Sequence, residues 1–202
     1  MDIVVYTQRV EIVESYNERR DCADQRISDF IYHCGYAPVA LPNDANQVES
    51  IVEEIHPTGI ILTGGNSLVK YGGNAPERDE TDRFLIQYAI DNSIPLYGFC
   101  RGMQSILDYW KCELVTVDGH VAVRHIVSGD EGRIEVNSYH NQGCIKLSGD
   151  ELVAELRAND GVIEKVRHTT YPIIGTMWHP EREDTFTKRD IDMVKKIFGG
   201  NV

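Results

Sequence analysis

Apolar residues recur along the first half of the chain in two alternating patterns. Short apolar runs are followed by longer segments whose apolar positions lie three or four residues apart, which is typical of strands alternating with helices. The expected strands cover residues 2–7, 37–41 and 59–62, and a further strand starts at Pro95. The expected helices cover residues 22–34, 47–55 and 76–92, the last beginning at either 76 or 79, and a further helix starts near Arg101.

The segment 22–34 shows the helical period most clearly. Asp21 stands directly before this segment and is expected to cap the helix. A polar loop that carries residues 16–20 is expected between the first strand and this helix. The apolar residues at helical spacing are Ile27, Phe30, Ile31 and Cys34.

The pattern changes after the helix that starts near Arg101. Short apolar runs then follow one another and predict strands at residues 113–117, 121–127, 133–136, 152–158, 161–167 and 171–178. A closing helix is expected at residues 188–198. The whole pattern predicts one α/β domain over residues 1–202, with parallel strands at the centre of the sheet and an antiparallel extension. In such sheets, ligands bind beyond the carboxyl ends of the strands.

Composition and charge argue against several function classes. The 202 residues are 42% hydrophobic, which is enough for one substantial core. No apolar run approaches the ~20 residues of a membrane span, and the N-terminal segment lacks an export signal. The net charge of −12 disfavours nonspecific nucleic-acid binding and anionic membrane surfaces. The five cysteines have no metal-type spacing, and their odd number argues against a complete disulfide framework, so a cytoplasmic location is expected.

One cysteine stands where the strand starting at Pro95 meets the next helix. Residues 98–102 read Gly-Phe-Cys-Arg-Gly, and the two glycines allow the sharp turn and close backbone approach of a nucleophile elbow. The amino end of the following helix favours negative charge and therefore a thiolate at Cys100. The pattern predicts a cysteine nucleophile. The alternative is a buried, inert cysteine, which is what we expect of the other four.

A histidine and a glutamate follow the strand 171–178. A cysteine nucleophile needs a base, and the base needs an acceptor that orients it. His179 and Glu181 lie two residues apart on an extended segment, which Pro180 stiffens. The carboxylate can therefore bind one ring nitrogen and leave the other for Cys100. A surface loop is the alternative for His-Pro-Glu taken alone.

A Gly-Gly turn follows the buried strand 59–62. Acyl transfer needs donors aimed at the developing oxyanion, and a glycine turn can present a bare backbone N–H. The expected donors are the amides of Gly65 and Arg101, the second of which lies next to the nucleophile. The alternative is an ordinary turn after a strand.

Three motifs resemble those of class I glutamine amidotransferase domains: the Gly-Gly turn, Gly-Phe-Cys-Arg-Gly-Met-Gln and Trp-His-Pro-Glu. They occur in the same order as in that family, and the resemblance covers nearly the whole chain. The resemblance implies a flavodoxin-like three-layer α/β sandwich and a catalytic triad of Cys100, His179 and Glu181 that forms a γ-glutamyl thioester. It implies that Gln104 helps to hold the α-amino and α-carboxylate groups of the glutamyl moiety. It implies no metal or redox cofactor. The loop 136–142 stands where the family carries its glutamyl-binding loop, which His140 is expected to shape. Its implied substrate-binding residues are Tyr139, His140, Asn141 and Gln142.

Two further segments narrow the resemblance. The segment 16–21 and the trio Arg78, Asp79 and Asp82 are similar to free-standing γ-glutamyl hydrolases, among them those that act on γ-glutamyl-γ-aminobutyrate. Over the whole chain, the resemblance implies a γ-glutamyl group on the nitrogen of a cytidine diphosphoramidate. Glutamate and CDP-amidate would be the products, in the bacterial pathway that adds phosphoramidate to capsular polysaccharide.

Two other function classes stay open. The chain could be a glutaminase subunit that passes ammonia to a separate synthase, or a catalytically silent binding module. The intact Cys, His and Glu set and the lack of a synthase domain favour a stand-alone hydrolase without an obligate synthase partner.

Cationic side chains near the expected site are candidates for holding the phosphates of a nucleotide-linked substrate. Arg19 and Arg20 are the first of these, and Lys70 and Arg124 come next. The guanidinium group meets phosphate oxygens in pairs, which suits arginine to this task. The alternative is a solvated charge cluster. The remaining histidines show no shared metal spacing and are expected to be structural or surface residues. They are His33, His56, His120, His125 and His168.

Overall fold

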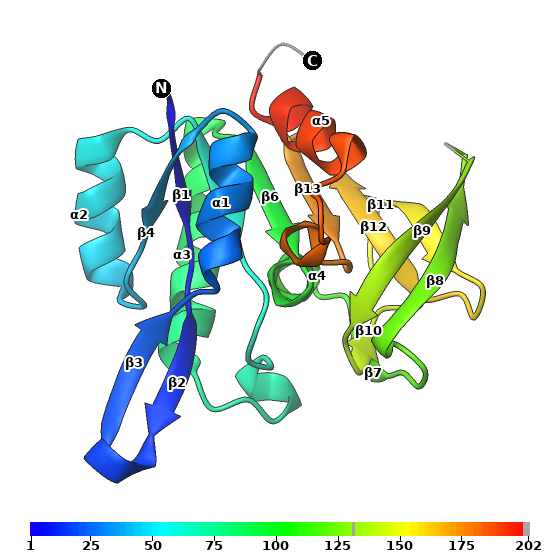
Figure 1. The fold of residues 1–202 in the computed structure, drawn as a ribbon, viewed down its shortest axis with the longest axis horizontal. Helices are drawn as coiled ribbons and strands as arrows, with labels where there is room; N and C mark the ends of the chain where they lie inside the picture. Colours follow the sequence, from blue (N-terminus) through cyan, green and yellow to red (C-terminus); the bar gives the residue numbers. More distant parts are fainter. Residues whose placement is uncertain (131, 200–202) are drawn as a thin grey trace.

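Nine strands form one sheet in residues 1–130 and 132–199, which the computed structural model describes (Figure 1). The first five strands in the sheet are mutually parallel. In spatial order they are β4 (Ala37–Ala40), β1 (Ile3–Tyr6), β5 (Gly59–Leu62), β6 (Leu96–Phe99) and β13 (Ile173–Thr176). The antiparallel extension continues with β12 (Ile163–His168), β11 (Leu152–Ala158), β8 (Val121–Gly129) and β9 (Gly132–Tyr139). The predicted α/β sheet with an antiparallel extension is therefore confirmed.

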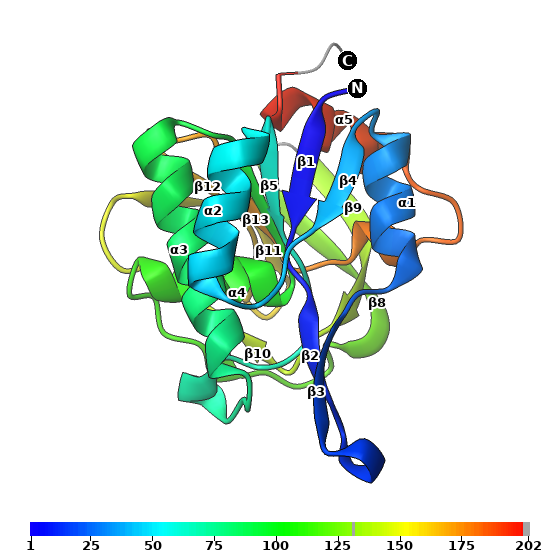
Figure 2. The ribbon, with the colours of Figure 1, turned by 90° about the vertical axis from the view of Figure 1, so that its left-hand side faces the viewer.

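Helices cover both faces of the parallel part of the sheet (Figure 2). One face carries α1 (Gln25–His33) and α5 (Lys188–Ile197), and the other carries α2 (Ala45–Ile55), α3 (Pro76–Asn92) and α4 (Arg101–Tyr109). None of the described helices is long and apolar enough to cross a membrane.

The two cores follow from the pleat of the strands. In β1, Val4 packs in the cluster under α1 and α5, whereas the next residue, Val5, packs in the cluster under α2, α3 and α4. Both residues are fully buried, so the central strands read as continuous apolar runs rather than as alternating ones.

The segment 9–22 differs from the prediction. A hairpin of β2 (Arg9–Val13) and β3 (Glu18–Cys22), with a short 3₁₀ turn at Glu14–Tyr16, projects from the edge of the molecule where a loop was expected (Figures 1 and 2). Only one residue of the two strands, Val10, is buried, so no apolar period reveals them in the sequence.

The start of α1 was also predicted wrongly. Cys22 pairs with Arg9 in the hairpin, so the helix begins only at Gln25. The cap is therefore Asp24, whose side chain accepts the Arg26 N–H at 2.9 Å. Asp21 instead accepts two hydrogen bonds from Asn43.

A two-residue ladder lies outside the main sheet. The strand expected at 113–117 is reduced to β7 (Val115–Thr116), which pairs with β10 (Gln142–Gly143). Strands of two residues are too short to show a period, and β10 was missed for that reason. This ladder joins the predicted glutamyl-binding loop to the segment after α4.

Candidate active site

The candidate nucleophile sits at the junction of β6 and α4. Cys100 has φ 51° and ψ −110°, a conformation that costs a residue with a side chain about 1–3 kcal/mol. Its N–H donates to the Thr176 carbonyl of β13 at 2.7 Å, and its carbonyl accepts the Gln104 N–H at 3.0 Å. A Cβ added at Gly102 would collide with the Leu62 carbonyl oxygen, so glycine is required where α4 crosses β5. The sheet and the helix therefore hold the strained turn from both sides.

The candidate base lies at the carboxyl end of the neighbouring strand, β13. Nδ1 of His179 is 2.7 Å from a carboxylate oxygen of Glu181, and both side chains are about 3–4% exposed. The imidazole meets the rings of Phe99 and Tyr139 edge to face, with centroids 5.7 and 5.6 Å away. Because Glu181 occupies Nδ1, the other ring nitrogen is left for Cys100.

The backbone of His179 is fixed by Asn137, for which no role was predicted from the sequence. Asn137, on β9, accepts the His179 N–H at 2.9 Å and donates to the His179 carbonyl at 2.8 Å. The sequence signal for this role is weak: a single asparagine in an otherwise strand-like segment. Its burial is seen only in the structure.

The charge state of His179 is set by its two partners. Burial alone would lower the pKa of His179, but the interactions with Cys100 and Glu181 outweigh it and raise the pKa to about 10. The imidazolium form is thus favoured when a thiolate and a carboxylate flank the ring. This is the electrostatic arrangement that a cysteine–histidine pair uses for nucleophilic attack.

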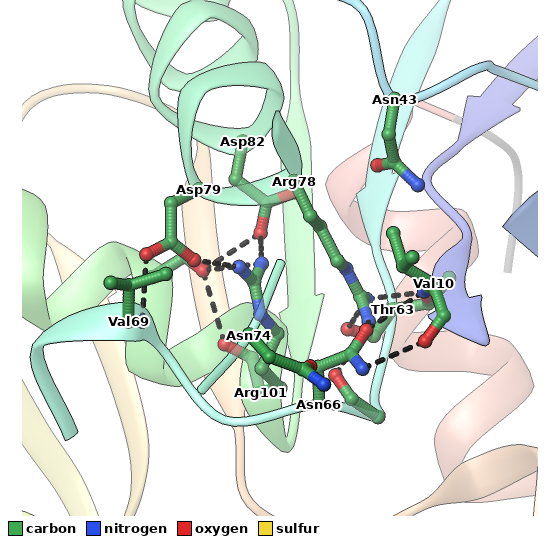
Figure 3. Close-up of polar contacts among 12 residues, drawn as sticks. Val10, Asn43, Thr63, Asn66, Val69, Asn74, Arg78, Asp79, Asp82 and Arg101 are labelled. Carbon is green, nitrogen blue, oxygen red and sulfur yellow. Dashed lines mark hydrogen bonds and ion pairs between the residues drawn. The ribbon is translucent and has the colours of Figure 1, made fainter. Parts of the chain in front are cut away.

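The Gly-Gly turn after β5 is held by a buried arginine of α3. Arg78 donates to the backbone carbonyls of Thr63 at 2.7 Å and Gly64 at 2.9 Å, and also to that of Gly65 (Figure 3). In a trans peptide the N–H points opposite to the preceding carbonyl, so the Gly65 N–H points away from Arg78. Burial and the charge of Arg101 lower the pKa of Arg78 to about 9, which leaves the guanidinium protonated at neutral pH.

The elbow is tied to the same helix. The buried Arg101 side chain binds Asp79 and Asp82 of α3, and donates to Ser105 at 3.0 Å (Figure 3). Ser105 in turn donates to Asp82 at 2.7 Å. The Cys100 carbonyl points along α4 toward Gln104, so the Arg101 N–H points out of the helix at its amino end.

From the sequence, Arg78, Asp79 and Asp82 were only a point of resemblance, and their contacts were not predicted. A signal was available, since Arg78, Asp82 and Leu85 lie at helical spacing on the buried face of α3. Charged residues on the apolar face of a helix indicate a buried polar network.

The glycine at position 64 gives a first test of this packing. A Cβ added there would lie 2.7 Å from Cε1 of His179. We expect Gly64→Ala to displace the imidazole and to lower kcat on the order of 10²-fold, because misplacement of a catalytic group by about 1 Å has that cost. Steady-state kinetics measures kcat, and thermal unfolding shows whether the variant is folded. Gly119→Ala strains the backbone at φ +77°, but its added Cβ meets nothing within 4 Å, so it is the control for loss of stability without displacement of the imidazole. Equal activities of the two variants would contradict the prediction.

The predicted glutamyl-binding residues come together around one carbonyl group. Nε2 of Gln104 donates to the Gln142 carbonyl at 3.1 Å, and Nδ1 of His140 lies 3.0 Å from the same oxygen. The Asn141 carbonyl accepts the Val117 N–H at 3.0 Å and so joins this loop to the segment after β7. Gln104 therefore positions the loop.

The other side of this loop is more open. Tyr139 is 40% exposed and packs against the His179 ring, and the guanidinium of Arg182 lies 4.3 Å from the Tyr139 ring centroid. The Gln142 side chain donates to the Tyr71 carbonyl at 3.1 Å. The loop 139–142 thus borders the candidate base, His179, and contacts the segment before α3.

Comparison with known proteins identifies the family. The sequence model described as glutamine amidotransferase class-I matches residues 20–198. The chain belongs to this family. The predicted family and fold are thereby confirmed.

Two curated γ-glutamyl hydrolases are similar to this chain over most of their length. A γ-glutamyl-CDP-amidate hydrolase of Campylobacter jejuni is 30% identical over 95% of each chain. A γ-glutamyl-γ-aminobutyrate hydrolase of Escherichia coli O157:H7 is 29% identical over 90% of this chain and 88% of the relative. At the level of the family, the prediction of a hydrolytic enzyme is confirmed.

Solved structures show the same amidotransferase fold. A putative GMP synthase component from Thermoplasma acidophilum has a TM-score of 0.71 at 22% identity, covering 98% of this chain and 94% of that one. A glutamine amidotransferase from Thermotoga maritima has a TM-score of 0.64 at 15% identity, covering 98% and 83%.

The candidate phosphate ligands do not lie among the candidate triad residues. Arg19 lies on the projecting hairpin, where it binds Glu77 and donates to the Asn74 carbonyl at 3.0 Å. Arg20 pairs with Glu18 at 2.5 Å. Both arginine side chains are about half exposed, so each can be drawn from its partner by a stronger anion. Their phosphate role stays a prediction.

The two second-rank candidates are paired as well. Lys70 lies 2.9 Å from Asp108, an interaction that raises the pKa of this lysine. Arg124 binds Glu135 at 3.1 Å and Glu183 at 3.0 Å. Glu183 also accepts from Asn137 at 2.8 Å, so Arg124 is the candidate that the contacts connect to the triad.

Proposed function

We propose that the chain hydrolyses a γ-glutamyl amide bond through a γ-glutamyl thioester on Cys100. The observation that carries this proposal is a cysteine in a strained elbow beside a buried His179–Glu181 pair. Nδ1 of His179 lies 2.7 Å from the Glu181 carboxylate, and all three residues follow parallel strands at one edge of the sheet. The family membership and the γ-glutamyl hydrolases among the relatives support it.

The first half-reaction forms the acyl-enzyme. The Cys100 thiolate attacks the δ-carbonyl carbon of the γ-glutamyl group, and the carbonyl π electrons move to the oxygen. The N–H groups of Gly65 and Arg101 stabilise this oxyanion, each contributing on the order of 10²–10³ in rate. As the C–N bond breaks, His179 donates its proton to the departing nitrogen.

The second half-reaction releases glutamate. The now neutral His179 takes a proton from water, which attacks the thioester carbon at the same oxyanion site. The C–S bond breaks, glutamate leaves, and the thiolate and imidazolium are restored together. Glu181 orients the imidazole through both steps and stabilises its positive charge.

The proposed substrate is γ-glutamyl-CDP-amidate, with CDP-amidate as the second product in the making of capsular phosphoramidate. The support is the Campylobacter jejuni hydrolase, which is similar to this chain over 95% of both lengths. The E. coli γ-glutamyl-γ-aminobutyrate hydrolase is nearly as similar, at 29% identity, so the aminobutyrate compound is the competing substrate. Both share the glutamyl half and differ in the leaving group.

Glutamate release by the purified chain tests the proposal. The substrates are glutamine, γ-glutamyl-γ-aminobutyrate and γ-glutamyl-CDP-amidate. We expect the highest kcat/KM with the nucleotide substrate. A preference for the aminobutyrate substrate would assign the chain to amine breakdown. If none is cleaved until a synthase is added, the proposal is wrong, because the chain is then a glutaminase subunit.

Arginine variants distinguish phosphate binding from surface charge. If Arg19 binds phosphate, Arg19→Ala lowers kcat/KM for γ-glutamyl-CDP-amidate about 10-fold or more, because a charge-assisted hydrogen bond contributes about 1.5–3 kcal/mol. The kcat/KM for γ-glutamyl-γ-aminobutyrate, which has no phosphate, should stay unchanged. Arg133→Ala, at an exposed position of β9, is the matched control. Equal losses with both substrates would argue against a phosphate role.

A further inference from the structure

Three histidines surround one buried carboxylate in the antiparallel half of the sheet. His120 stands just before β8, His140 just after β9, and His125 lies within β8. They converge on Glu164 of β12, which has no exposed surface. The rings of His125 and His140 each lie 4.8 Å, centroid to centroid, from that of His120.

The geometry points to a transition-metal site, of the kind that binds Zn²⁺, formed by His120, His140 and Glu164. The three donor atoms lie within 4.8 Å of one another. Nδ1 of His120 and Nε2 of His140 are each 3.3 Å from the same carboxylate oxygen. In a tetrahedral zinc site with bonds of about 2.0–2.1 Å, neighbouring ligand atoms are about 3.3 Å apart. Two of the three pairs therefore already have the spacing of zinc ligands.

These donor atoms make no hydrogen bond within the described part of the chain. Nδ1 of His120, Nε2 of His140 and both oxygens of Glu164 are buried there without a hydrogen-bond partner. Buried polar atoms of native proteins are almost always satisfied, and a carboxylate in such a position needs a cation. One divalent ion would satisfy all three side chains.

The outward nitrogen of each ligand histidine is bound as in known metal sites. Nε2 of His120 lies 2.8 Å from Asp160, and Nδ1 of His140 lies 3.0 Å from the Gln142 carbonyl. Because these partners are acceptors, each outer nitrogen carries the proton. The inner nitrogen of a neutral ring then presents its lone pair to Glu164. Lone pairs facing a carboxylate repel unless a cation lies between them, and metal-bound histidines have this second contact almost without exception.

His125 borders the site on its other side. Its Nε2 is 3.6 Å from the second carboxylate oxygen of Glu164. A monodentate Glu164 leaves the fourth position of a tetrahedral ion to water or to this imidazole. We therefore expect His125→Ala to weaken binding less than the loss of a ligand from the trio.

An ion at this position would join the glutamyl-binding loop to the catalytic strand. His140 lies within the loop 139–142, and the Glu164 carbonyl accepts the Met177 N–H of the segment leading to His179 at 2.8 Å. The ion would thus order one wall of the site and take no part in the chemistry. Its binding does not depend on the substrate assignment.

Metal titration of the full chain tests the site. The chain is stripped with a chelator, dialysed and titrated with Zn²⁺, and bound metal is counted by mass spectrometry. We expect one Zn²⁺ per chain and a higher Tm with the ion than without it. Glu164→Gln should lose the ion, and Asp160→Asn should bind about 10–100-fold more weakly, because it removes only the contact behind His120. Asp160 is half exposed, so this variant is expected to fold even if Glu164→Gln does not.

Cobalt and a histidine control separate this site from the cysteines. Co²⁺ in the expected site shows no thiolate-to-metal charge-transfer band, because its ligands are nitrogen and oxygen. His33→Gln, at an exposed helix position, should bind as the wild type does. The inference fails if no stoichiometric ion binds or if a thiolate band appears. It also fails if binding is unchanged in both Glu164→Gln and Asp160→Asn, in which case the cluster holds protons only.

Discussion

Cys100→Ala is expected to abolish turnover, lowering kcat on the order of 10⁴-fold or more. Without sulfur there is no thioester, and removal of a nucleophile from a catalytic triad has a cost of at least this size. The fold should persist, because the side chain is small and the elbow is held by backbone hydrogen bonds to Thr176 and Gln104. Glutamate release gives the rate. Mass spectrometry of acid-quenched enzyme should show a glutamyl adduct on the wild type and none on the variant.

A second buried cysteine provides the control. Cys34 follows α1 and is 2% exposed, and burial raises its pKa to about 12, so its thiol is inert at neutral pH. We expect Cys34→Ala to keep kcat while losing some thermal stability from the apolar contacts around it. If Cys100→Ala retained adduct formation, or if Cys34→Ala removed it, the nucleophile would be misassigned.

The convergence of the candidate site residues could be predicted, because they stand at the ends of strongly apolar strands. Gly65 follows β5, Cys100 follows β6 and His179 follows β13. Parallel strands place their carboxyl ends at one edge of a sheet, so three motifs far apart in sequence are expected to meet there. β13 pairs with β6 although several antiparallel strands lie between them in the sequence. This pairing was not predicted, because the register between strands that are distant in sequence depends on the whole sheet.

The polar networks could not be predicted in the same way. Arg101 meets Asp82 only because α3 and α4 pack side by side, and sequence periodicity does not say which helices are neighbours. His120 and His140 approach because β8 pairs with β9, which sets Val121 opposite Tyr139. Glu164 comes from a strand that is not hydrogen-bonded to either of them. Because its members come from separate segments, ligand spacing along any one segment does not reveal such a cluster.

Arg78 is the positioning residue whose loss should have the second-largest effect on the reaction. Its guanidinium binds three successive carbonyls of the turn that carries Gly65, and no other charged group reaches them among the described residues. With Arg78→Met the turn loses this anchor, and the Gly65 N–H no longer holds its direction. We expect kcat to fall about 10²–10³-fold, the cost of one oxyanion donor, with KM little changed, because the contact is made in the transition state.

The same change should lower the free energy of unfolding. Carbonyls left buried without a donor cost about 1–3 kcal/mol each, and the turn can recover part of this by admitting water. Urea unfolding measures the loss. The free energy of unfolding of Arg78→Lys is expected to lie between those of the wild type and Arg78→Met. An ammonium keeps the charge but does not reach three carbonyls as the planar guanidinium does.

Arg83→Met is the matched control, since it makes the same substitution at an exposed position of the same helix. It should leave kcat and the unfolding curve unchanged. A folded Arg78→Met enzyme with normal kcat would show that the turn keeps its shape without the arginine. A rise in KM at constant kcat would mean that the turn binds the ground state of the substrate, and the oxyanion donors would then have to be sought at the amino end of α4 alone.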